Sequence, residues 1–86
     1  MIKINKEITS ITNSIEDFVR SHYKIINISN FRYSEFTDCY TFSFTHIDNN
    51  NKLSQGGYFP YMNLLHINYY DKDGKMITQK FDIDFN

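Results

Sequence analysis

Two aspartates and a glycine, Asp71, Asp73 and Gly74, have the spacing that opens a calcium-binding loop. An EF-hand loop also needs a bidentate glutamate at its twelfth position. That position is Asp82 here, in a segment whose residues alternate as in a strand. A tight turn between two strands explains the same residues. We therefore interpret them as a hairpin turn and expect no calcium site.

Three histidines and one cysteine are the other residues that could bind a metal or act as nucleophiles. His22, His46 and His66 show no i, i+4 pair, and Cys39 has no second cysteine for a CxxC motif or an internal disulfide. A nucleophilic cysteine also needs a base and an oxyanion hole, and the sequence indicates neither. We expect no catalytic residue, no metal and no other cofactor, and we interpret Cys39 as a small core residue.

An aromatic segment follows a pair of glycines near the middle of the chain. Three aromatic residues, a proline and a methionine occur within five positions after the pair, and such residue types dominate protein-binding hot spots. The proline keeps its neighbour extended and does not fit a central strand. The segment could equally fold back over an uncovered sheet face. The candidate partner-binding residues here are Tyr58, Phe59, Tyr61 and Met62.

The last part of the chain places Lys80, Asp82 and Asp84 on the outer face of an expected strand. On an exposed strand they are solvated, and they also protect a sheet edge from aggregation. They could instead meet a charged partner surface, so we add them to the candidate partner-binding residues. The net charge is −1, and residues 35–86 carry seven acidic and four basic groups. This balance argues against a nucleic-acid partner.

The elements that must position these residues follow from hydrophobic periodicity. Apolar residues at spacings of three and four predict an amphipathic helix over about residues 4–22. A change in apolar parity between Ile28 and Phe31 predicts a bulge near Ser29-Asn30. The strands are expected at 24–33, 39–48, 58–70 (entered at Tyr58 or only after Pro60) and 75–85, with a turn at 34–38 and a long polar loop at 49–57.

Turn chemistry predicts the register of the last hairpin. Asp71 to Gly74 fit a type I turn followed by a left-handed glycine, which pairs Asp71 with Lys75. This register places the apolar residues of both strands on one face, whereas a two-residue loop would split them. The predicted pairs are Tyr69 with Ile77, Ile67 with Gln79, Leu65 with Phe81, and His66 with Lys80 on the outer face.

The fold class that results is α+β, with one N-terminal helix packed on a four-stranded antiparallel meander in a single domain, residues 1–86. Four strands make a face about 19 Å wide, and one helix covers about 10 Å. The part of the sheet face that the helix leaves open must be covered by sheet curvature, by the 49–62 loop or by another chain. We therefore expect a homodimer, formed through 58–62 or the edge strand 24–33. The expected core face comprises Tyr40, Phe42, Phe44, Leu65, Ile67, Tyr69, Ile77, Phe81 and Ile83.

These features favour a non-enzymatic interaction protein that binds, and inhibits, another protein. The chain shows neither a signal peptide nor an apolar span, which favours the cytoplasm and excludes a membrane partner. Its small size and its Ile-, Asn- and Lys-rich composition fit a phage or mobile-element product of the anti-CRISPR or other anti-defence kind. The alternatives are a small-ligand-binding or enzymatic module with a cavity between helix and sheet, lined by residues such as Tyr40, Tyr69, His66 and Cys39, and a toxin-immunity protein.

Overall fold

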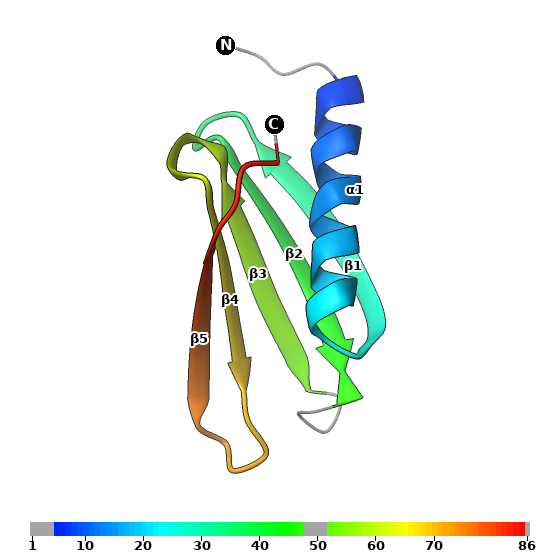
Figure 1. The fold of residues 1–86 in the computed structure, drawn as a ribbon, viewed down its shortest axis with the longest axis vertical. Helices are drawn as coiled ribbons and strands as arrows, with labels where there is room; N and C mark the ends of the chain where they lie inside the picture. Colours follow the sequence, from blue (N-terminus) through cyan, green and yellow to red (C-terminus); the bar gives the residue numbers. More distant parts are fainter. Residues whose placement is uncertain (1–4, 48–51, 86) are drawn as a thin grey trace.

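One helix lies across the inner face of a curved antiparallel sheet (Figure 1). The computed structural model describes residues 5–47 and 52–85. The sheet has the strand order of the chain, β1-β2-β3-β4-β5, so every strand pairs with its neighbours in sequence. The elements are α1 (Asn5–His22), β1 (Ile25–Ser34), β2 (Cys39–His46), β3 (Leu53–Phe59), the 3-10 turn η2 (Pro60–Met62), β4 (Leu64–Tyr70) and β5 (Met76–Asp82).

The sheet has five strands, so the prediction of four was wrong. Most of the expected 49–57 loop is β3, and the expected single strand 58–70 is interrupted by η2, which begins at Pro60. Residues 48–51 lie outside the described residues. β3 was missed because Ser54, Gln55 and the two glycines have low strand propensity. It forms nonetheless because Phe42 of β2 faces Gly56, and the large ring covers the glycine.

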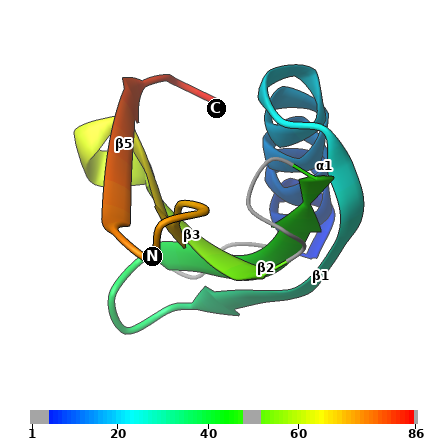
Figure 2. The same cartoon turned by 90° about the horizontal axis from the view of Figure 1, so that it is seen from below.

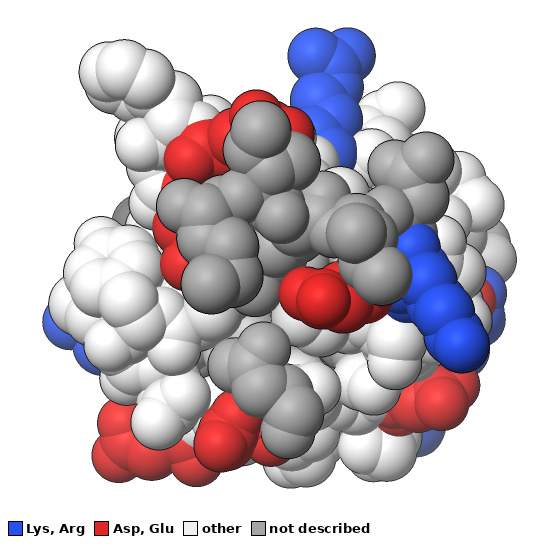
Figure 3. Space-filling model, turned by 90° about the horizontal axis from the view of Figure 1, so that it is seen from above, with Lys and Arg blue, Asp and Glu red and all other residues white. Residues whose placement is uncertain are grey.

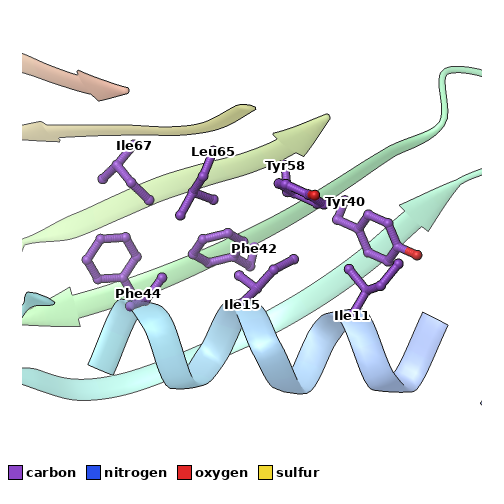
Figure 4. Close-up of a cluster of buried hydrophobic side chains, with 9 residues drawn as sticks. Ile11, Ile15, Tyr40, Phe42, Phe44, Tyr58, Leu65 and Ile67 are labelled. Atoms are coloured by element: carbon purple, nitrogen blue, oxygen red, sulfur yellow. The ribbon is translucent and has the colours of Figure 1, made fainter. Parts of the chain in front are cut away.

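The helix prediction was confirmed over the described residues, because α1 ends at His22 as expected; residue 4 lies outside them. Its apolar stripe faces the sheet, with Ile11, Ile15 and Val19 buried. Figure 4 shows Ile11 and Ile15 pointing toward the aromatic side chains of β2. The stripe lies over only part of the sheet, nearest to β1 and β2 (Figure 2).

The predicted bulge in the first strand was confirmed. Ser29 pairs with Ser43 and Arg32 with Thr41, so β1 has one extra residue between these pairs. Asn30 lies at this bulge and has a left-handed backbone conformation, with a φ of 60°. A second register shift lies between Ile25 and Asn27, which the sequence did not indicate. β1 is therefore an irregular edge strand.

The predicted register of the last hairpin was also confirmed. Tyr69 pairs with Ile77, Ile67 with Gln79 and Leu65 with Phe81. Gly74 has the required positive φ, 80°. The Asp71 carboxylate accepts hydrogen bonds from the backbone N–H groups of Asp73 and Lys75, both at 2.9 Å. These aspartates and the glycine therefore serve the turn.

Sheet curvature closes much of the inner face that α1 leaves open. β5 stands opposite α1 across the concave side (Figure 2), and Phe81 packs edge-on against Phe18 of α1 with ring centroids 5.1 Å apart. The C-terminal residues add to this closure, because Phe85 contacts both Phe18 and Tyr58. Of the expected core face, Tyr40, Phe42, Phe44, Leu65 and Ile67 are buried, and Tyr69, Ile77, Phe81 and Ile83 are half-buried.

Candidate functional site

The aromatic segment divides between the core and the surface. η2 turns the chain between β3 and β4, and Asn63 ends it with a φ of 49° and an N–H bond to the Pro60 carbonyl. Pro60 is buried and Phe59 half-buried. The side chains of Tyr61 and Met62 are 67% and 49% exposed. Two of the candidate partner-binding residues are thus presented to solvent on a tight turn.

Tyr58 belongs to the core rather than to this surface. Its side chain is fully buried. The hydroxyl donates a hydrogen bond to the Ile83 carbonyl at 3.2 Å and accepts one from the Phe85 N–H at 2.9 Å. Strand alternation explains the difference, because Tyr58 points to the inner face and Phe59 to the outer face. We therefore omit Tyr58 from the candidate surface.

Phe36 is a candidate residue that the sequence reading missed. It lies in the turn between β1 and β2, and its side chain is 99% exposed. A hydrogen bond closes the turn, because the Tyr33 hydroxyl donates to the Asp38 carboxylate at 2.6 Å. Asp38 ends the turn in the left-handed conformation, with a φ of 48°. The available signal was an aromatic residue in the middle of a polar turn, where it could not reach the core.

The two exposed turns lie at the same end of the sheet (Figure 1). The strand pairings place Cys39 opposite Ser34, and Leu64 opposite both Phe59 and Asp82. Two strand spacings, about 10 Å, separate the β1–β2 turn from η2. We call this surface the turn end, and define it as residues 34–38, 59–64 and 82–85.

The residues that define the turn end include acidic side chains and no basic ones. Its four charged residues are Glu35, Asp38, Asp82 and Asp84, and its sequence contains no Lys, Arg or His. Figure 3 shows red acidic side chains at this end of the molecule, with blue basic side chains from other segments also in view. Lys80, the remaining candidate, pairs with His66 beyond the turn end and is exposed. The structure thus groups Phe59, Tyr61, Met62, Asp82 and Asp84, adds Phe36, and leaves Lys80 outside.

Among the described residues, the cysteine and a buried tyrosine have raised pKa values. Burial, with a further contribution from Asp38, raises the pKa of the Cys39 thiol, which disfavours the reactive thiolate. Cys39 lies half-buried outside the core cluster, contrary to the expectation that it is a core residue. Burial raises the pKa of Tyr40 to about 12, away from neutrality.

The histidines lie apart. His22 is exposed at the end of α1, His66 is half-buried on the outer face, and His46 is buried among Tyr23, Phe44 and Tyr69. Within residues 5–47 and 52–85, no three His, Cys, Asp or Glu side chains gather as metal ligands would. No helix in the same ranges is long and apolar enough to span a membrane.

A hollow of about 370 Å³ lies between the first turns of α1 and the C-terminal residues. Its lining residues are Lys6, Glu7, Ser10, Ile11 and Phe85, and none of the side chains considered for a ligand cavity lines it. Between helix and sheet, the described side chains form a packed apolar cluster (Figure 4).

Comparisons with protein-family models, with curated proteins and with solved structures find no match for this chain.

Proposed function

We propose that this protein is a non-enzymatic interaction protein that binds another protein through its turn end. The main observation behind this proposal is that Phe36 is exposed on a turn that the Tyr33–Asp38 hydrogen bond closes. A fully exposed phenylalanine gains nothing from folding, because it buries no apolar surface. Its rigid presentation suits insertion into an apolar pocket of a partner, as hot-spot residues do.

Tyr61 and Met62 extend the same surface. With Phe36 they supply three exposed apolar side chains from two neighbouring turns, and aromatic residues and methionine are enriched where protein interfaces are fully buried. Hydrogen bonds fix the backbone of both turns before binding, which lowers the entropy lost on association. The turn end therefore has the residue types of an interface core.

The charge of the turn end supports a basic partner surface. The four carboxylates of the turn end would repel an acidic partner and nucleic acid, and would steer a basic surface into place. Association should then slow as salt increases, because screening shortens the range of this attraction. Cytoplasmic inhibition of a host protein by a phage or mobile-element product is the biological role that we propose, on the basis of the amino-acid composition.

The test compares matched pairs of exposed residues at opposite ends of the sheet. Met62 and Met76 are equally exposed, at 49% and 50%, and Tyr61 and Tyr70 form a second pair at 67% and 46%. The unmodified chain is immobilised, and proteins that it retains from a bacterial host lysate are quantified by mass spectrometry. A partner should be retained by Met76→Ala and Tyr70→Ala and lost from Met62→Ala, Tyr61→Ala and Phe36→Ala.

Measured affinities for the identified partner then show how much each truncation weakens binding. Truncation of each turn-end residue should weaken binding roughly tenfold or more, with little change in the thermal midpoint because these side chains are exposed. Equal loss of binding at the two ends would contradict the proposal. Parallel loss of stability would show that the turn-end residues act through the fold.

A further inference from the structure

The outer edge of β5 offers a second interaction surface, which shares only Asp82 with the turn end. β5 is the last strand of the sheet, and within residues 5–47 and 52–85 no strand pairs with its outer side. An unpaired edge presents a row of backbone N–H and C=O groups that another strand can bind.

The hairpin register identifies those outward groups. The Asp71 N–H bonds to the Lys75 carbonyl, and the Ile83 N–H bonds to the Asn63 carbonyl. Bonded pairs alternate along an antiparallel ladder, so Ile77, Gln79 and Phe81 direct their backbone groups toward β4. The residues that direct their backbone groups outward are consequently Met76, Thr78, Lys80 and Asp82.

The two edges of the sheet differ in regularity. β1 has two register shifts, and α1 packs beside it. β5 pairs with β4 over seven consecutive positions without a shift and contains no proline. Bulges protect a sheet edge against pairing. β1 has this protection, whereas β5 has only the charges of Lys80 and Asp82.

We propose that a second copy of this chain pairs with β5, antiparallel and about a two-fold axis at Gln79. In this register all seven strand residues find partners, and outward backbone groups face outward groups. On the inner face, Ile77 lies opposite Phe81 of the second copy. Both side chains are only half-buried at the sheet edge, so pairing them buries more apolar surface. The inner face of the strand is self-complementary about Gln79 in its apolar pattern.

The neighbouring registers are less favourable. Moving the axis to Lys80 places two ammonium groups opposite each other, and moving it to Thr78 places Ile77 opposite Gln79. Moving it to Phe81 shortens the overlap of the two β5 strands to residues 80–82, so Ile77 falls outside it. With the axis at Gln79, Lys80 faces Thr78 of the second copy. Because β1 is irregular, pairing stops at a closed dimer rather than continuing into a fibre.

Cysteine scanning tests the register directly. In a Cys39→Ser background, Ile77→Cys, Thr78→Cys, Gln79→Cys and Lys80→Cys are made singly and exposed to mild oxidant. A residue on the axis lies opposite itself, within disulfide distance. Thr78 and Lys80 lie about 7 to 8 Å from their own copies along the diagonal, beyond that distance. Gln79→Cys should therefore form a disulfide-linked dimer, and the other variants should stay unlinked.

Light scattering across the micromolar range tests the dimer without an added cysteine. The unmodified chain should approach twice the monomer mass as concentration rises. Lys80→Pro removes an outward N–H while leaving the bonds to β4 intact, so it should stay monomeric, and Lys80→Ala should still dimerise. A chain that stays monomeric throughout, or cross-links at Thr78→Cys or Lys80→Cys as fast as at Gln79→Cys, overturns the proposal. Binding through the turn end is measured separately and can fail or succeed independently.

Discussion

The ring of Phe42 occupies the space that a side chain at Gly56 would need. A Cβ built on Gly56 would lie 2.2 Å from the Cζ atom of that ring. Phe42 cannot easily move away, because it is buried and stacked on Phe31, with ring centroids 5.2 Å apart. This contact between β2 and β3 explains why a glycine stands in the middle of a strand.

Gly56→Ala should therefore destabilise the protein by about 1–3 kcal/mol, the usual cost of overpacking a core. Gly57→Ala is the matched control, because its Cβ would meet the nearest atoms at an ordinary 3.5 Å. Urea unfolding of both variants measures the difference. Equal free energies of unfolding would show that the ring yields without cost.

Gly74→Val should destabilise the protein by about 1 kcal/mol or more, because Gly74 has a φ of 80° that a β-branched residue rarely adopts. A Cβ there meets nothing within 4 Å, so backbone strain alone carries the effect. Gly74→Asn should cost less, since asparagine tolerates this conformation. Thermal unfolding of both variants distinguishes strain from a general effect of substitution at the turn.

Two buried tyrosines should respond in opposite ways to loss of the hydroxyl. Among the described residues the buried Tyr40 hydroxyl has no hydrogen-bond partner, so Tyr40→Phe should stabilise the protein by removing a group whose burial costs about 1–3 kcal/mol. The Tyr58 hydroxyl makes two hydrogen bonds to the C-terminal residues, so Tyr58→Phe should destabilise it. Denaturant midpoints of the two variants that move in the same direction would refute this pair of assignments.

Stability should fall at alkaline pH. Burial raises the pKa of both Tyr23 and Tyr40 to about 12, with a smaller contribution from Tyr69 to the former and from Asp38 to the latter. In the unfolded chain these phenols ionise near pH 10. As pH rises from about 10 to about 12, the unfolded state loses protons that the folded state keeps, so the free energy of unfolding decreases. Tyr23→Phe should reduce this slope; a slope unchanged by the substitution would contradict it.

Local chemistry made some elements predictable from sequence. The last hairpin follows from Asp71 and Gly74 together with the apolar parity of its strands, and the bulge at Asn30 follows from the change of parity in β1. Both depend on residues close in the chain. The helix could be predicted because its apolar stripe is long and regular.

β3 and the turn end could not be predicted in the same way. β3 depends on Phe42, a residue on another strand, and its own residues favour a loop. Tyr58 and Phe59 are neighbours in sequence but lie on opposite faces, so assigning them to core or surface required the position where β3 begins. Phe36 carries no periodic signal, and its exposure is evident only once the turn is placed.

A sheet whose strand order matches the chain order has consequences for folding kinetics. Each hairpin closes only a short loop, so the strands can associate stepwise with little loss of chain entropy. The helix is different, because its contacts join residues far apart in the chain, such as Phe18 and Phe81. Since α1 is rich in residues with poor helix propensity, we expect it to gain stable structure late, on a sheet that has already formed.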